Sequence, residues 1–407
     1  MIKKILVNGA LLLFSVLAVV LSVEWFIDHY LITQTPLKFQ YALADAPRIL
    51  AQSSKRGRLP ENYLALVGDS YAQGKGDWLL EADPNQNGPF HSAHLIQQRT
   101  GQDVISFGKS GVGSVGGIAV EPIADYEFLK NYVDSAWQPP QKIWVYFYAG
   151  NDLTDNLESL HRTFLPHHAI TDLHNQAIMD GYFREQIENR RGVRPFPPLP
   201  TNKGWLFRAV YTLLDSMSKK LQDPEVAPAQ TAWKAGTTLA RIAGRETLLP
   251  DGLQANGLYL SETQVQDAVA VLQASLAYLH RYFPAAEMTT IYVPSVLEPY
   301  DVVSEDISYA QYLPEVPTHK HSIRKGTTRL LQQRSNALCR QVRAAALVAG
   351  TGFIDTRARL RTAAQQELIH GPRDWKHFNK AGYHALVAAI LDQPAMDCMN
   401  LSFKRAE

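Results

Sequence analysis

"LVGDSYAQGKGD", residues 66–77, closes a short apolar run with the tripeptide Gly-Asp-Ser and continues into a second group of glycines around Lys75. Such a stretch suits either a glycine-rich loop that holds phosphate or a turn that presents a serine as nucleophile. A phosphate loop needs four residues between its glycines and a Ser or Thr after the lysine. Here five residues separate Gly68 from the glycine before Lys75, and another glycine follows the lysine. The spacing excludes the phosphate loop, and we interpret Ser70 as a candidate nucleophile.

Apolar runs alternate with amphipathic segments around this stretch. We predict strands at 62–70, 103–111, 142–152, 288–295 and 352–356, and helices at 89–101, 121–137, 261–283, 321–348 and 379–391. Ser261 and Gln264 have the spacing of a capping box at the start of one of these helices. Each strand is a nearly continuous apolar run, which is typical of a parallel sheet covered by helices on both faces. The sequence therefore predicts an α/β fold.

The alternation stops after Asp152. Residues 155–258 contain proline-rich loops, one predicted helix at 205–221 and few strand signals. We interpret this region as a helical and loop insertion that forms a cap over the site. The flanking segments, 62–154 and 259–395, are then the two parts of one domain.

The N-terminus has the pattern of a membrane helix. Lys3 and Lys4 precede the apolar segment 5–27, which is long enough to cross a bilayer and carries Trp25 near its far end. We predict a transmembrane signal anchor at 1–28, followed by a linker at 29–61. The alternative is a signal peptide cleaved after Ser22. Both alternatives export the rest of the chain.

Charge and cysteine content restrict the function further. Forty basic residues balance thirty-nine acidic ones, so the net charge is +1 and we expect no nucleic-acid partner. Cys339 and Cys398 are not part of a CxxC pair, which argues against redox or zinc chemistry. They form either one disulfide or two buried free thiols. The histidines lack an accompanying set of cysteines or carboxylates, so we expect no metal site.

The segment GVGSVG (111–116) has the glycine spacing of a dinucleotide-binding turn. That motif also needs an acidic residue about 20 positions later, at the end of the next strand. Asp134 lies in a predicted helix instead, and the next strand carries no acid before Asp152. We therefore expect no dinucleotide cofactor, and interpret the glycines as permitting close backbone approach in a tight loop.

A distant segment supplies the partners that a nucleophilic serine needs. In "RDWKHFNKAG" (373–382), Asp374 and His377 are three residues apart, just before the last predicted helix. A serine becomes reactive when a base removes its proton, and a carboxylate fixes the tautomer of that base. Ligands of open α/β sheets bind at the carboxyl ends of the strands, where Gly111 and Asn151 are also predicted to lie. Their backbone and amide N–H groups are suitable donors to an oxyanion.

Together these segments resemble the SGNH hydrolases, also called the GDSL esterase/lipase superfamily. Gly68-Asp69-Ser70 matches the first block of the family, and "AGND" around Asn151 approximates the third. Gly111 corresponds best to the glycine of the second block, and Asp374 and His377 match the last block. The residues that depart from the family pattern are Tyr71, Phe107 and Phe378. The resemblance implies a flavodoxin-like, three-layer α/β/α fold with a five-stranded parallel sheet.

The resemblance also implies a mechanism without metal or cofactor. Ser70 would be the nucleophile, His377 the base and Asp374 its orienting carboxylate, while Asp69 would organise the turn. The oxyanion would be held by the Ser70 and Gly111 N–H groups and by the Asn151 amide.

We therefore expect a single-pass protein of the cytoplasmic membrane with an esterase domain on the periplasmic side. Its expected substrate is an O-acetyl or other short acyl ester, carried by a glycan or a lipid. An O-acyltransferase that modifies an envelope polysaccharide is the first alternative. A non-catalytic binding protein on an esterase scaffold is the second.

Overall fold

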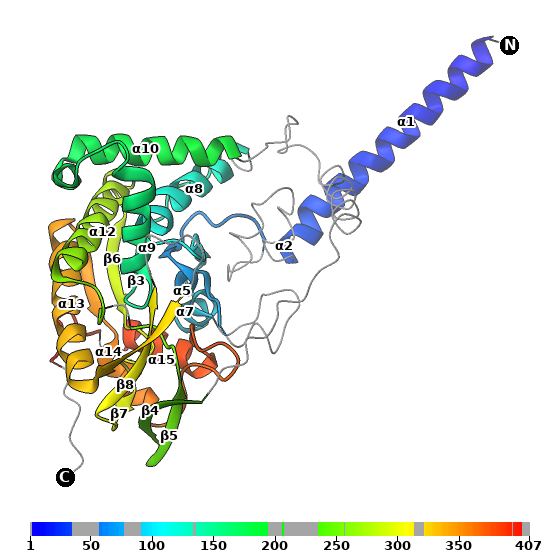
Figure 1. Cartoon of the computed structure of the whole chain (residues 1–407). Helices are drawn as coiled ribbons and strands as arrows, with labels where there is room; N and C mark the ends of the chain where they lie inside the picture. Colours follow the sequence, from blue (N-terminus) through cyan, green and yellow to red (C-terminus); the bar gives the residue numbers. More distant parts are fainter. Residues whose placement is uncertain are drawn as a thin grey trace.

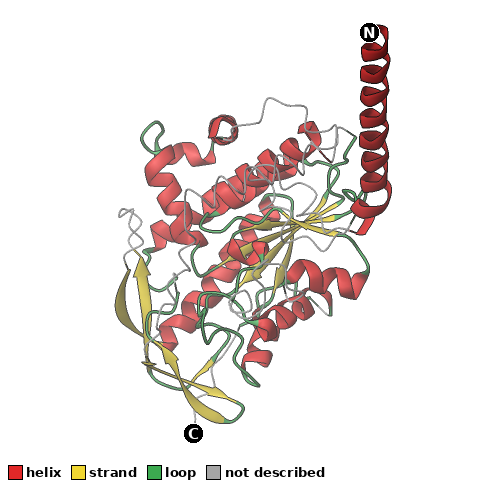
Figure 2. Ribbon diagram, turned by 90° about the vertical axis from the view of Figure 1, so that its right-hand side faces the viewer, coloured by secondary structure: helices red, strands yellow, loops and turns green. Residues whose placement is uncertain are grey.

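A computed structural model describes residues 2–34, 57–76, 91–132, 136–193, 206, 235–255, 257–312, 321–392 and 394–400. Its centre is a five-stranded sheet, in which every pair of neighbouring strands is parallel (Figures 1 and 2). The strand order is β10 (Gly352–Asp355), β6 (Glu287–Val293), β3 (Lys142–Tyr148), β1 (Leu64–Gly68) and β2 (Val104–Ser106). The predicted α/β fold with a five-stranded parallel sheet is confirmed. The second and third strands end earlier than predicted, at Ser106 and Tyr148.

Helices cover both faces of this sheet because alternate side chains of the buried strands point to opposite faces. Ala65 and Val67 of β1 belong to one apolar core, and Leu64 and Leu66 belong to the other. The first core is completed by α8 (Glu121–Tyr132), α12 (Glu262–Tyr282) and α13 (Thr328–Val348). The second is completed by α7 (Ser92–Thr100), α14 (Arg357–Ala364) and α15 (Lys380–Leu391).

The capping residues predicted at the start of one helix and at the end of another are confirmed. Helix α12 begins after Ser261, whose hydroxyl accepts a hydrogen bond from the N–H of Gln264, while Gln264 Oε1 accepts one from the Ser261 N–H. Helix α7 ends at Gly101, which has a φ of 73°. Capping chemistry thus fixed the limits of these helices better than hydrophobic periodicity alone.

The long helix predicted at 321–348 is wrong in its first turns. His321–Thr327 is a strand, β9, which pairs antiparallel with β8 (Asp306–Tyr312), and α13 begins only after Thr327. The Thr327 hydroxyl caps α13 by accepting a hydrogen bond from the Leu330 N–H. Residues 321–327 form a strand because they pair with β8, which lies in the segment predicted to be a polar loop. The short sequence of 321–327 does not by itself indicate this pairing.

The inserted region begins with helices. These are α9 (Asp152–Ser159), the π-helical turn η3 (Leu160–Phe164), the 3₁₀ turn η4 (Ile170–His174) and α10 (Gln176–Val193). The helix predicted at 205–221 lies outside the described residues except for Leu206.

The inserted region then forms a β-hairpin, which its interpretation as a helical and loop insertion does not include. Strands β4 (Ala235–Ile242) and β5 (Arg245–Pro250) pair antiparallel, and β4 also pairs with β7 (Asp301–Val302). The two turn residues, Ala243 and Gly244, both have positive φ, as tight hairpin turns require. The first of these positions holds an alanine instead of the Asn, Asp or Gly that usually indicates such a turn, so the sequence did not predict it.

The N-terminal helix projects from the rest of the molecule (Figure 1). It comprises α1 (Ile2–Phe26), η1 (Ile27–Leu31) and α2 (Ile32–Gln34), so the segment predicted as a linker starts as helix. The continuous helix is long and apolar enough to cross a membrane, and none of its apolar stretch is buried. A signal sequence near an N-terminus has the same properties.

Cys339 and Cys398 form a disulfide with a Cα–Cα distance of 5.9 Å. The bond joins α13 to the C-terminal segment, and the free-thiol alternative is wrong.

Candidate active site

The turn that carries the candidate nucleophile Ser70, here called the nucleophile turn, begins where β1 ends. Gly68 has a φ of 139°, and a Cβ there would lie 2.5 Å from the carbonyl oxygen of Tyr146 on the neighbouring strand, so only glycine fits. The next residue, Asp69, caps the short helix α5 (Ser70–Gln73) by accepting a hydrogen bond from the Tyr71 N–H at 2.9 Å. This arrangement presents Ser70 at the carboxyl edge of the sheet and confirms that Asp69 organises the turn.

Three of the predicted site residues form one hydrogen-bonded chain. The Ser70 Oγ lies 2.9 Å from His377 Nε2, and His377 Nδ1 lies 2.6 Å from Asp374 Oδ2. Burial raises the pKa of the Asp374 carboxyl, but the charge of His377 and hydrogen bonds from His377 and the Lys376 N–H outweigh it and hold that pKa below its usual value. An ionised Asp374 accepts a hydrogen bond from the His377 Nδ1–H, which leaves Nε2 to accept one from the Ser70 hydroxyl.

Tyr71 fixes the histidine loop to the nucleophile helix. Its hydroxyl donates to the carbonyl of Lys376 at 2.9 Å, and its ring lies 5.5 Å from the His377 ring and edge-on to Phe378. Two of the three aromatic departures from the SGNH pattern, Tyr71 and Phe378, thus pack against each other, and Tyr71 also packs beside His377. Sequence analysis assigned Tyr71 no role, although a large aromatic directly after the nucleophile was a visible signal.

The loop after β2 is held against α5. The Ser106 hydroxyl donates to the carbonyl of Ala72 at 2.6 Å, and a Cβ at Gly108 would lie 2.2 Å from the backbone nitrogen of Gln73. This contact carries the loop past Ser70 and into position at the pocket, where Gly111 lies with a φ of 75°.

Two of the three glycines in GVGSVG, Gly113 and Gly116, serve close packing, as the tight-loop interpretation predicted, whereas a Cβ at Gly111 would meet nothing within 4 Å. A Cβ at Gly113 would lie 2.5 Å from Asn156 Oδ1, and one at Gly117, just beyond the motif, 2.8 Å from the carbonyl oxygen of Gly68. Side chains at these positions would push the loop away from α9 and from the nucleophile turn.

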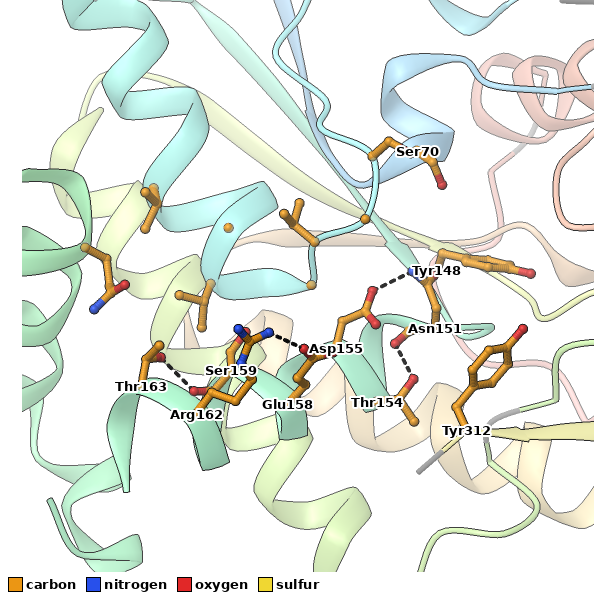
Figure 3. A pocket seen from close by; sticks show the side chains of 18 of the residues that line it. Ser70, Tyr148, Asn151, Thr154, Asp155, Glu158, Ser159, Arg162, Thr163 and Tyr312 are labelled. Atoms are coloured by element: carbon orange, nitrogen blue, oxygen red, sulfur yellow. Dashed lines mark hydrogen bonds and ion pairs between the residues drawn. The ribbon is translucent and has the colours of Figure 1, made fainter. Parts of the chain in front are cut away.

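Asn151 precedes α9, but its side chain does not cap the helix. Instead, its Nδ2 donates to Asp155 Oδ2 at 2.6 Å (Figure 3). One N–H of the amide is thus used to orient the group, and the second remains for another acceptor. The residue stands next to the pocket, as the oxyanion prediction requires.

These groups share one pocket of about 730 Å³. Ser70, His377, Gly111 and Asn151 all line it, and Asp374 lies behind His377. Only Asp374 of the predicted site residues therefore has no place in the pocket wall, which suits a group that acts through the histidine.

Three carboxyl groups that sequence analysis did not assign to the chemistry surround the nucleophile turn. Burial raises the pKa of Asp69 to about 6. Burial and the charge of Asp69 raise the pKa of Asp155 to about 7, and the same causes raise that of Asp152 well above its usual value. The three groups do not all ionise at neutral pH, which limits negative charge beside Ser70.

Among the described residues, the one group with three metal-ligating atoms close together is Cys339, Asp355 and Cys398. Its two sulfurs are bonded to each other, so they offer no thiolates.

No protein-family model matches the chain, and no curated protein matches it in sequence.

Proposed function

We propose that the chain is a serine esterase of the SGNH type that hydrolyses short acyl esters, with O-acetyl esters the first expectation. The observation that carries this proposal is the hydrogen-bonded chain from Ser70 through His377 to Asp374, at the edge of the sheet and open to the pocket. A serine, a base and an orienting carboxylate in this order are the requirements of nucleophilic acyl transfer.

The proposed reaction has two halves. Ser70 Oγ attacks the ester carbonyl while His377 Nε2 takes the hydroxyl proton, and the imidazolium is stabilised by Asp374. The tetrahedral oxyanion accepts hydrogen bonds from the N–H groups of Ser70 and Gly111 and from the free N–H of Asn151. His377 then gives its proton to the departing alkoxide, which leaves as the alcohol. Water attacks the acyl-enzyme by the same route, releases the carboxylic acid and restores the serine.

The proposed location is the outer side of the cytoplasmic membrane, facing the periplasm. The helix over residues 3–34 is suited to anchor the protein, and Lys3 and Lys4 favour a cytoplasmic N-terminus. The Cys339–Cys398 disulfide supports export because such bonds persist in oxidising compartments.

Replacement of Ser70 by alanine tests the mechanism. We expect Ser70→Ala to abolish hydrolysis of a small aryl acetate and labelling by a fluorophosphonate probe, with an unchanged circular dichroism spectrum. Wild-type labelling at Ser70 would also exclude the non-catalytic alternative. Unchanged turnover in the variant would refute the proposed nucleophile.

A second candidate function is acyl transfer to a glycan hydroxyl instead of water. The observation that favours it is the extension of the pocket beyond the triad to Tyr182 and Gln186 of α10, where an acceptor has room to bind. Mass spectrometry of an oligosaccharide incubated with the protein and an acyl donor separates the two functions. Appearance of the acylated oligosaccharide would establish the transferase.

A further inference from the structure

One side of the helix formed by α9 and η3 faces the pocket, and that side is entirely polar (Figure 3). The pocket-lining residues that follow Asn151 form adjacent pairs that repeat every four positions: Thr154 and Asp155, Glu158 and Ser159, and Arg162 and Thr163. We call these residues the polar stripe. The apolar residues of the same helix, Leu153, Leu157, Leu160 and Phe164, are buried in the core. The polar stripe thus faces a cavity that starts at the catalytic centre.

The opposite wall of the cavity has a different chemistry. It is formed by the glycine-containing loop at 110–113 and by the first turns of the following helix, and it presents the side chains of Val112, Val115 and Val120. The cavity therefore has one wall of hydrogen-bonding groups and one wall of methyl groups and glycine backbone.

The polar wall has unused hydrogen-bonding capacity. The Ser159 hydroxyl and the Gln186 amide, which lies at the far end of the cavity, have no hydrogen-bond partner among the residues that the structure describes. Arg162 gives one N–H to Glu158 Oε1 at 2.6 Å, and its guanidinium carries further donors. These groups are placed to bind a ligand that offers both donors and acceptors.

We infer that the polar stripe, which extends away from Ser70, binds the sugar units of a neutral, acylated oligosaccharide. Sugar hydroxyls donate to and accept from the polar stripe, while the C–H faces of the rings lie on the valine wall. This inference rests on the proposed function, because the acyl group on the sugar is what Ser70 attacks.

The two walls argue against a long acyl chain in the same place. A hydrocarbon chain would cover the polar stripe without offering a single hydrogen bond, which is unfavourable for every group it desolvates. Within the stripe, the half-buried Glu158 forms an ion pair with Arg162, so these two charges offer no surplus to a strongly charged polymer.

The length of the stripe exceeds that of one sugar. Thr163 lies nine positions after Thr154, which corresponds to about 14 Å along a helix. We therefore expect the affinity of the cavity for an oligosaccharide to increase with each sugar unit that is added, up to several units.

Matched substrates test the inference on the full chain in detergent. The series consists of an aryl acetate, O-acetylated xylose and O-acetylated xylotetraose, with an aryl palmitate as the lipid-like competitor. We expect kcat/KM to be highest for the tetraose. Ser159→Ala and Gln186→Ala should each lower that value by about five- to tenfold and leave aryl acetate hydrolysis unchanged. Glu185→Ala, an exposed position on the same helix as Gln186, is the control and should change neither.

Binding of unacetylated xylotetraose, followed by calorimetry, separates the two proposals. Failure to hydrolyse aryl acetate together with binding that depends on Gln186 would reject the esterase and keep the sugar site. Hydrolysis of aryl acetate with no gain from added sugar units and no binding would reject the sugar site alone. Preference for the palmitate would reject it in favour of an acyl-chain groove.

Discussion

Replacing Asp374 with asparagine tests the proposed mechanism at its most specific point. Both oxygens of the carboxylate accept hydrogen bonds: Oδ1 from the Lys376 N–H at 2.9 Å, and Oδ2 from His377 Nδ1 at 2.6 Å. Asparagine has one oxygen, and the rigid backbone N–H of Lys376 is the donor that cannot move away. The new NH₂ group then faces Nδ1 and requires it to be an acceptor. The ring proton moves to Nε2, which can no longer accept the Ser70 proton.

The expected loss follows from this change of tautomer. A wrongly protonated histidine lowers the turnover of a serine hydrolase by about 10⁴, which corresponds to about 5.4 kcal/mol of transition-state stabilisation. The side chain keeps its size and its bond to Lys376, so we expect little change in folding.

The assay is initial-rate hydrolysis of an aryl acetate by the wild type, Asp374→Asn and Ser70→Ala, at equal amounts of folded protein. Ser70→Ala gives the background rate, and the rate of fluorophosphonate labelling reports the reactivity of Ser70 without turnover. Asp374→Asn should slow both hydrolysis and labelling, with little effect on KM. A loss of less than about tenfold, with labelling unchanged, would refute the role that we assign to Asp374.

Three other changes probe separate parts of the site and scaffold. Asn151→Ala should lower kcat by about 10²–10³ with a smaller effect on KM, as loss of one oxyanion donor does, and steady-state kinetics measure both. Because burial raises the pKa of Asp155 to about 7, the folded state holds a proton that the unfolded state releases, so this group favours folding less as pH rises from about 4 to 7. Asp155→Asn keeps an acceptor for Asn151, and its melting temperature should exceed that of the wild type near pH 8 and converge with it near pH 4, as thermal unfolding at each pH would show. The disulfide closes a loop of 59 residues, so replacing Cys339 and Cys398 by serine should lower the free energy of unfolding by about 4 kcal/mol in urea titrations. Each expectation fails if its measured quantity matches the wild type.

The sequence predicted the sheet and the meeting of Ser70 with His377, although 307 positions separate them. The reason is physical. Long apolar runs identify parallel strands, and the carboxyl ends of parallel strands lie at one edge of the sheet, so polar residues that follow those runs converge.

The hairpin of β8 and β9 could not be predicted from the sequence because its stability comes from the pairing of the two strands. Residues 321–327 were assigned to a helix that does begin at Thr328, and nothing within seven residues distinguishes the strand from an extra helical turn. The partner strand decides, and it lies in a segment with no strong strand signal of its own.

The polar stripe shows a different limit of sequence analysis. The spacing of polar and apolar residues over 151–164 is visible in the sequence and marks two faces of one helix. It cannot say whether the polar face meets water or a ligand cavity, because the opposite wall comes from a loop about forty residues earlier in the chain. Since Leu157 and Leu160 pack in the core from the other face of the helix, a change such as Ser159→Ala alters the cavity without removing that packing. We therefore expect substitutions at the more exposed positions of the polar stripe, such as Ser159, to change which ester is accepted far more than they change the stability of the fold.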